Sequence, residues 1–318
     1  MFLADFSGIE NAVFVGEFEA GSESWHEARA NGIGGSEIAA VVGLSPWESR
    51  YSLWHRKKGR LRPVRVSEPM RWGTLLEPVI AAEYAQHHLP PGCTMTTGGT
   101  FRHRHRAYQI ANPDGLIWSE AGDLVDGVEI KVVGEDHHEK WPRAGSDAIP
   151  IYYRCQIAWY CDVLDLDSMV LRVLIGGHDA RSYRVRPTLS DREYLRAEGE
   201  QFWRDLADDV PPNLDSHTET YRALRELHPD IDRSNIVDVP FDLAQRWWAA
   251  QAAVDRAGDE FSSVRSELAD LMGTAWKARC GDAPVAYRVR PWTSDGDPYV
   301  RSAPRPVAGT SIVEAVAA

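Results

Sequence analysis

The chain has 318 residues, of which 43% are hydrophobic and 26% are charged, and its formal net charge is −12. These values predict a soluble, packed protein with one large domain or two smaller ones. The acidic balance argues against nucleic-acid binding only if the cations are spread evenly, because an enzyme can gather its Lys and Arg residues in one groove.

No membrane or export segment is visible in the sequence. The N-terminus, MFLADFSGIE, lacks a basic region followed by an apolar one, and no run of about 18 apolar residues occurs. We therefore expect a protein that has no membrane partner and stays in the cytoplasm.

The four cysteines, Cys93, Cys155, Cys161 and Cys280, form no C-x-x-C pair. Their spacing argues against a zinc ribbon and against a cysteine-held iron–sulfur cluster. Cys155 and Cys161 lie in an apolar stretch with a helical pattern, so we expect them to behave as small buried hydrophobic residues.

Helical periodicity recurs along the chain. Residues 33–44, IGGSEIAAVVGL, predict a glycine turn and a short apolar helix with Ser36 as its N-cap. The polar stretch 213–235 is expected to be a connection. Further helices are predicted over residues 49–58, 71–88, 149–164, 189–208 and 240–273, and in the second of these Leu75, Val79, Ala82 and Tyr84 share one face.

Short apolar runs bounded by turn residues predict strands between these helices. The segment EAGDLVDG at 120–127 is typical of a hairpin connection. The strand–helix–strand order after it indicates an α/β sheet covered by helices. The predicted strands cover residues 94–101, 108–112, 114–118, 127–133, 168–177 and 286–292.

The strongest chemical signal is Asp114-Gly115 followed by Glu129-Ile130-Lys131. Side chains alternate along a strand, so Glu129 and Lys131 point to one face while Ile130 points into the core. A hairpin can bring Asp114 beside them. Two carboxylates at that point can hold a hard divalent cation that contacts a phosphate, and Lys131 can orient or deprotonate the attacking water or steady the phosphate charge.

The alternative for this motif is a surface strand with an ordinary ion pair, because E-x-K tripeptides are common. Apolar strands flank the motif, and the acidic residues stand at the strand ends. Such an arrangement is costly unless a cation binds there, which favours the chemical interpretation.

Five sequence blocks follow one another over about residues 24–212: WHEARANGIGGSEIAAVVGLSPWESRYSLWHRKKG, WGTLLEPVIAAEY, NPDGLI, VEIK and YYRCQIAWYCDVLDLDSMVLRVLIGG. In content, order and spacing they resemble the YqaJ-type phage recombinase family, which includes the lambda-type alkaline exonucleases, within the PD-(D/E)XK nuclease superfamily. The resemblance implies an α/β, restriction-endonuclease-like core with a central mixed β-sheet flanked by helices.

The resemblance also implies roles for single residues. Asp114, Glu129 and Glu77 match the metal-binding carboxylates of the family, and Lys131 matches its catalytic lysine. Gln156 matches a glutamine of a later helix that approaches the same centre. The residues alone leave two alternatives open: Glu77 could be a solvated helix residue, and Gln156 could only bind neighbouring backbone.

Arg29 and Ser36 match the residues that hold the terminal 5′-phosphate of DNA in the lambda-type enzymes. A guanidinium offers a planar fork to phosphate oxygens, and a helix N-terminus favours anions. Ser36 could equally be a plain N-cap, and Arg29 could pair with a nearby acid such as Glu27.

The activity that the resemblance implies is a Mg²⁺-dependent 5′–3′ exonuclease, with Mn²⁺ as a substitute, that degrades linear double-stranded DNA and exposes 3′ single strands for phage-type homologous recombination. Implied partners are DNA ends, further copies of the chain in a ring, and a single-strand annealing protein in a bacterial host. Two alternatives stay open: a structure-specific or endonucleolytic nuclease on the same core, and a non-catalytic DNA-end-binding protein.

We expect the nuclease core over residues 1–215, a mainly helical extension over 216–292 and a disordered tail over 293–318, which is rich in Ser, Gly, Pro and Ala. The basic run 102–106 is expected to be a solvated loop. The pair His137-His138 lacks an evident third zinc ligand. Core positions are expected for three tryptophans, Trp47, Trp54 and Trp72.

Overall fold

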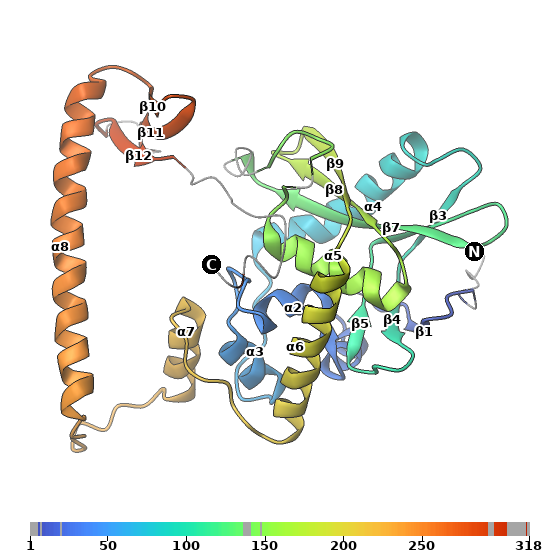
Figure 1. Ribbon diagram of the computed structural model, residues 1–318, viewed down its shortest axis with the longest axis horizontal. Coiled ribbons are helices and arrows are strands. Elements are labelled where there is room, and N and C mark those ends of the chain that lie inside the picture. Colours follow the sequence, from blue (N-terminus) through green and yellow to red (C-terminus); the bar gives the residue numbers. More distant parts are fainter. Residues whose placement is uncertain are drawn as a thin grey trace. The chain divides into compact units, whose positions relative to one another are not determined.

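The computed structural model describes residues 6, 8–19, 21–135, 141–146, 148–291, 296–303 and 316. The chain divides into two compact units, Met1–Pro229 with Val307–Ala318, and Asp230–Pro306. Figure 1 shows the elements of each unit. No helix of the described residues is long and apolar enough to cross a membrane.

The first unit contains both helices and strands, and the second unit contains a long helix and a small sheet. The helices are α1 Glu23–Ala30, α2 Gly35–Val41, α3 Arg50–Lys57, α4 Glu68–His87, α5 Ile151–Leu164, α6 Leu189–Ala207, α7 Thr218–Leu227 and α8 Phe241–Met272. The strands are β1 Ala12–Gly16, β2 Ile33–Gly34, β3 Thr94–Thr97, β4 Thr100–His103, β5 Gln109–Ala111, β6 Gly115–Trp118, β7 Leu124–Val133, β8 Met169–Ile175, β9 Asp179–Val185, β10 Lys277–Cys280, β11 Ala283–Val289 and β12 Tyr299–Ser302.

Within the described part of the first unit, the central sheet has the strand order β3-β6-β7-β8-β9. Strands β7 and β8 are parallel and are connected through α5, whereas the other neighbouring strands are antiparallel. A parallel pair needs such a crossover, because a short turn can join only antiparallel strands. This sheet confirms the expected α/β core with a central mixed β-sheet.

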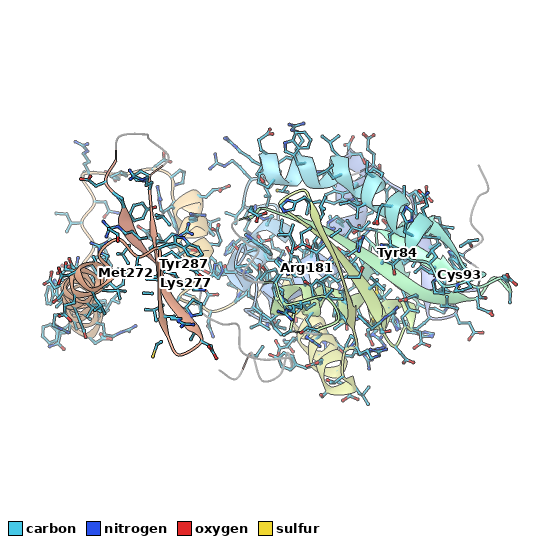
Figure 2. The ribbon with its side chains drawn as sticks, turned by 90° about the horizontal axis from the view of Figure 1, so that it is seen from above. Tyr84, Cys93, Arg181, Met272, Lys277 and Tyr287 are labelled. Atoms are coloured by element: carbon cyan, nitrogen blue, oxygen red, sulfur yellow. The ribbon has the colours of Figure 1, made fainter. Side chains whose placement is uncertain are left out.

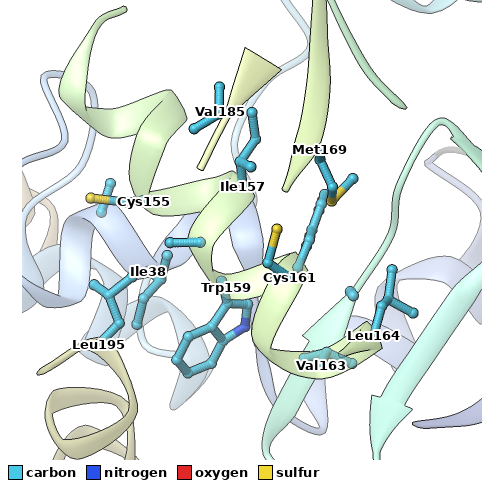
Figure 3. Close-up of a cluster of buried hydrophobic side chains, with 14 of the residues drawn as sticks. Ile38, Cys155, Ile157, Trp159, Cys161, Val163, Leu164, Met169, Val185 and Leu195 are labelled. Atoms are coloured by element: carbon cyan, nitrogen blue, oxygen red, sulfur yellow. The ribbon is translucent and has the colours of Figure 1, made fainter. Parts of the chain in front are cut away.

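Helices cover both faces of the central sheet. On one face, Ile80 and Tyr84 of α4 pack against Ile117, Ile130 and Val170. The opposite face meets α5, which is buried along nearly its whole length. Figure 3 shows part of this second cluster, in which α5 lies among residues of α2, α6 and the sheet: Ile38, Cys155, Ile157, Trp159, Cys161, Met169, Val185 and Leu195.

Burial of these side chains stabilises the position of α5 on the sheet. Removing a Leu or Ile side chain from water contributes about 1.5–3 kcal/mol. Cys155 and Cys161 are both fully buried, which confirms that they behave as small hydrophobic residues. Because α5 is fixed in this way, its polar side chains are held at defined points above β7.

A second sheet, with the order β1-β4-β5-β2, stands beside the central one. The sequence predicted one strand over 94–101, but the chain bends at Gly98-Gly99, and β3 and β4 belong to different sheets. A Cβ atom on Gly98 would lie 1.6 Å from the carbonyl oxygen of Pro113, and Gly99 has φ +136°. Glycine is therefore required at this bend.

Several local predictions are wrong. Ser36 is not an N-cap: α2 begins at Gly35, Gly34 occupies the cap position, and Ser36 lies in the first turn. In α4, Leu75 and Val79 are exposed, whereas Tyr84 is buried on the other side. Ile80 and Tyr84, four residues apart, form the inner face instead.

The tryptophan predictions hold only for Trp54, which is fully buried. Trp47 is 62% exposed and Trp72 is 51% exposed. The stretch 213–235 contains helix α7, whose residue Ala223 packs against Tyr51 and Leu61 in the first unit.

The second unit contains α8 and the antiparallel sheet β10-β11-β12. Met272 at the end of α8 is buried, as is Tyr287 of β11, and the Lys277 ammonium lies 5.4 Å from the centre of the Tyr287 ring. These three residues are labelled in Figure 2. Residues 299–302 form β12 although disorder was expected after residue 292, because they pair with β11.

Candidate active site

Asp114 directly precedes β6 and is fixed against β7. Its backbone N–H donates to the carbonyl oxygen of Val128 at 3.1 Å. Its Oδ2 accepts the backbone N–H of Ile130 at 2.6 Å. The predicted hairpin thus brings Asp114 beside the Glu129-Ile130-Lys131 segment.

Glu129 and Lys131 point to the face of β7 that α5 covers, whereas Ile130 packs under α4 on the other face. Lys131 Nζ lies 2.5 Å from Oε1 of Glu129. Gln156 of α5 donates from Nε2 to the same oxygen. The alternation predicted for this strand is confirmed, and it places a cation beside a buried carboxylate.

The second carboxylate oxygen of Glu129, Oε2, is buried and has no hydrogen-bond partner among the described residues. Buried polar atoms in folded proteins are nearly always paired, since an unpaired one costs free energy. An orphaned carboxylate oxygen at this position indicates a binding partner that the protein itself does not supply.

Three acids share this environment. Burial raises the pKa of Asp114 well above its ordinary value, and the charges of Glu129 and Glu77 raise it further. Burial followed by the Glu129 charge also raises the pKa of Glu77, although a side-chain hydrogen bond with Asp114 opposes the shift. The pKa of Glu129 is raised by burial, against the opposing charge of Lys131. The three carboxylates therefore destabilise one another as anions.

The same negative charges favour the charged form of Lys131. Burial alone would lower the pKa of Lys131, but the carboxylates of Glu129 and Asp114 outweigh burial and raise it. The ammonium lies 5.6 Å from the ring centre of Tyr153 on α5. Lys131 is thus a fixed cationic donor at the centre of the acidic cluster.

The donor set fits a hard divalent cation. Carboxylate oxygens suit Mg²⁺ or Mn²⁺, and a bound cation would relieve both the repulsion among the acids and the orphaned Oε2 of Glu129. In the described residues, no three side chains of the His, Cys, Asp and Glu types already form a cage for a metal ion. Lys131 and Gln156 instead occupy Oε1 of Glu129.

Arg29 and Ser36 lie together, as the motif match implied. Arg29 Nη2 lies 2.8 Å from Ser36 Oγ, and the guanidinium lies 4.6 Å from the centre of the Trp25 ring. Burial raises the pKa of Glu129, and the charge of Arg29 opposes this shift after the stronger effects of Lys131 and Gln156. The guanidinium therefore acts on the charge of Glu129.

The acid beside Arg29 is Glu37, 3.9 Å away, and not the Glu27 that the sequence suggested as an alternative. Glu37 is bound more closely by Lys57, at 2.9 Å, and by the backbone N–H of Gly34, at 2.7 Å. Lys57 and Arg29 together lower the pKa of Glu37 despite its burial. Because Lys57 is the closer partner of Glu37, Arg29 keeps capacity for another anion.

Sequence reasoning missed two aromatic residues of α5. The hydroxyl of Tyr160 lies 3.1 Å from Gln156 Nε2, and Tyr153 lies under Lys131. Their signal was the spacing of 153, 156 and 160, which places all three on one helix face. Gly35 is also part of the site, because a Cβ atom there would lie 2.3 Å from the Tyr160 ring.

The basic run 102–106 is the expected solvated loop only in part, because Arg102, Arg104 and His105 are exposed but residues 102–103 belong to β4. His103 is buried, and its Nδ1 accepts the backbone N–H groups of His105 and Arg106, each at 3.0 Å. Arg106 forms an ion pair with Asp162 at 2.9 Å. The run therefore stabilises the fold. The pair His137-His138 lies outside the described residues.

Comparisons with known proteins agree with the motifs. Residues 24–166 match the YqaJ-like viral recombinase domain. The chain is 27% identical to the uncharacterized protein YqaJ of Bacillus subtilis (strain 168) over 231 residues, which is 70% of this chain and 68% of that protein. It is 28% identical to a protein of African swine fever virus over 117 residues, 35% of this chain but only 32% of the viral protein.

Among solved structures, the alkaline exonuclease LHK-Exo from Laribacter hongkongensis aligns with a TM-score of 0.45 and 20% sequence identity. The alignment covers 59% of this chain and 94% of that one. The match over residues 24–166 includes Arg29, Asp114, Lys131 and Gln156. Residues 24–166 of the chain are therefore similar to the YqaJ-like viral recombinase domain.

Proposed function

We propose that this protein is a metal-dependent deoxyribonuclease that degrades linear double-stranded DNA from its 5′ ends and leaves 3′ single strands for phage-type homologous recombination. The observation that carries the proposal is the buried acidic cluster around Lys131, with its orphaned Glu129 oxygen. The YqaJ-like viral recombinase domain supports the role in recombination.

In this proposal, Asp114, Glu129 and Glu77 hold Mg²⁺, for which Mn²⁺ can substitute. The bound cation supplies Lewis acidity toward the phosphodiester and its attacking water. Gln156 fixes the orientation of the Glu129 carboxylate through Oε1, and Lys131 presents a positive charge to the phosphate on which negative charge develops.

Arg29 and Ser36 are proposed to bind the terminal 5′-phosphate. A terminal phosphate carries more negative charge than an internal phosphodiester, so a fixed guanidinium can recognise an end without reading a base. The Trp25 ring and Ser36 hold the guanidinium, and Lys57 competes successfully for Glu37. These contacts support an end-binding role.

Two partners belong to the proposal on the basis of the domain family alone. They are further copies of the chain in a ring and a single-strand annealing protein that takes up the exposed 3′ strand. The proposed 5′–3′ direction of degradation likewise rests on the domain family and on Arg29.

The deciding experiment digests linear and covalently closed circular duplex DNA with Mg²⁺, beside reactions with EDTA. We expect that linear DNA is degraded and closed circular DNA is not, and that this degradation requires Mg²⁺. Cutting of closed circles at the same rate as linear DNA would support the endonuclease alternative. Binding of linear DNA ends without any cleavage would support an end-binding protein. Asp114→Asn serves as the inactive variant, and Asp123→Asn, at an exposed site of the same hairpin, serves as its control.

A further inference from the structure

Helix α8, Phe241–Met272, is 32 residues long, and only Met272 among its residues is buried. Its length corresponds to about 48 Å at about 1.5 Å per residue. A helix in a protein is stabilised mainly by packing of an apolar face, because an isolated helix is marginal in water. Within the described residues of its unit, α8 lacks such packing along most of its length.

The apolar residues of α8 follow a heptad pattern. Trp247 is 63% exposed, Val254 is 71% exposed and Leu271 is 84% exposed. Steps of four and three residues alternate without interruption through Leu243, Trp247, Ala250, Val254, Ala257, Phe261, Val264, Leu268 and Leu271. A 3.5-residue repeat of this kind forms the seam of a coiled coil. We call these nine residues the α8 seam.

The charges of α8 argue against DNA as the occupant of this seam. The helix contains six acidic residues and three basic ones, a net charge of −3. The acids Glu260 and Glu267 stand next to seam positions, where they would repel a polyanion. The side opposite the seam is polar, with Asp259, Ser262 and Ser266. An apolar helix is therefore the fitting partner.

The side-chain volumes of the seam indicate antiparallel pairing with an identical helix. In one antiparallel register, Phe261 faces Ala250 of the second helix, Trp247 faces Val264, Val254 faces Ala257, and Leu268 faces Leu243. Eight of the nine seam residues then pair within the seam, and Leu271 lies beyond the last of these pairs. In parallel pairing, Trp247 and Phe261 would each face themselves, and Ala250 and Ala257 would leave underfilled layers.

Charge complementarity agrees with this register. Arg246 and Glu267 flank the seam and face each other twice across the antiparallel pair. A parallel pair would instead bring Glu260 near Arg265, so the charges permit either orientation and the packing of large against small residues distinguishes them. Two antiparallel copies of one helix are related by a two-fold axis, so every contact between them occurs twice. Such a pair is complete with two helices.

We infer that α8 pairs with α8 of a second copy of this chain as an antiparallel two-helix coiled coil. The inference does not depend on the proposed nuclease activity. The coiled coil joins the first units of two separate chains in one particle.

The test measures the mass of the full-length protein by light scattering during gel filtration. Val254→Glu/Phe261→Glu places charges in the seam, and Ser262→Glu/Ser266→Glu adds the same charges to the polar side as a matched control. We expect the wild type and the control to have twice the mass of the seam variant. Equal masses for all three proteins would overturn the inference.

Cysteine cross-linking tests the orientation and does not require a charge in the seam. Leu243→Cys and Leu268→Cys are made in a chain that carries Cys93→Ser and Cys280→Ser. Co-expression of the two variants should give a disulfide between different chains, whereas each variant alone should give little. Cross-linking of each variant to itself would show parallel pairing and would overturn the antiparallel arrangement.

Discussion

Gln156 of α5 donates a hydrogen bond to Oε1 of Glu129 on β7, so a helix fixes the orientation of a carboxylate on the strand beneath it. Lys131 donates to the same oxygen at 2.5 Å. Both donors therefore converge on Oε1, and Oε2 is left without a partner among the described residues. This division of roles between the two oxygens explains why the cluster fits an added cation.

Asp114→Asn is expected to abolish cleavage and to increase the stability of the metal-free protein. An amide oxygen can still accept the Ile130 N–H, but the repulsion with Glu129 and Glu77 disappears. We expect a loss of at least about 100-fold in cleavage rate and a gain of about 1 kcal/mol in the free energy of unfolding. Urea denaturation and single-turnover digestion measure the two effects.

The matched control is Asp123→Asn, an exposed position in the same hairpin. It should change neither the unfolding free energy nor the cleavage rate. Full activity of Asp114→Asn with Mg²⁺ would remove this residue from the metal site. A loss of stability in Asp114→Asn would show that repulsion among the acids is not the dominant effect.

Lys131→Met should separate chemistry from binding. Methionine keeps most of the length of the side chain and loses the charge next to Glu129. The cleavage step should fall by on the order of 100-fold, while the affinity for DNA ends changes little. Single-turnover rates beside a binding titration distinguish the outcomes. Equal losses in both would assign Lys131 to phosphate anchoring.

Arg29→Ala should reduce the preference for 5′-phosphorylated over 5′-hydroxyl linear duplex. Arg29→Lys should restore only part of it, because an ammonium keeps the charge and loses the fork. Arg102→Ala, at an exposed position of β4, is the matched control and should keep the full preference. If the wild type degrades both kinds of end at one rate, Arg29 has no role in recognising the phosphate.

Gly35→Ala should perturb the site through Tyr160. The added Cβ atom would lie 2.3 Å from the ring of Tyr160, whose hydroxyl contacts Gln156. Overpacking of this kind costs about 1–3 kcal/mol and should also reduce cleavage. Gly73→Ala in α4 has open space around its Cβ atom and should instead stabilise the helix, by about 1 kcal/mol. Thermal unfolding of the two variants should shift in opposite directions.

Local patterns predicted the centre of the site because its geometry is local. Alternation along β7 placed Glu129 and Lys131 on one face, and a hairpin placed Asp114 beside them. The contact between Gly35 and Tyr160 joins two helices that are distant in the sequence. Such contacts depend on how elements pack, so no spacing in the sequence reveals them.

The incorrect predictions have equally specific causes. Helix α4 carries two apolar stripes, one with Leu75 and Val79 and one with Ile80 and Tyr84, and periodicity alone does not say which one meets the sheet. Strand β9, Asp179–Val185, was missed because its sequence is largely polar, and pairing with β8 decides its conformation.

His103 should make the stability of the fold depend on pH. Burial, followed by the nearby charge of Arg106, lowers the pKa of His103 to about 4, although the charge of Asp162 opposes the shift. In the folded state its Nδ1 accepts two backbone N–H groups, which requires an unprotonated nitrogen. The unfolded chain protonates His103 near the ordinary histidine value of about 6.5. Between these two pKa values the unfolded state binds more protons, so the free energy of unfolding falls as the pH falls.

The measurement compares the melting temperature at pH 7 and pH 5 for the wild type and two variants. His103→Asn offers an amide oxygen to the same N–H groups and does not titrate, so its melting temperature should fall less between pH 7 and pH 5. His26→Asn, at an exposed position, should behave as the wild type does. At pH 7, where His103 is neutral, His103→Asn should lose stability only through imperfect packing. An unchanged pH dependence in His103→Asn would mean that other groups, among them the Asp162 carboxylate, control acid unfolding of this protein.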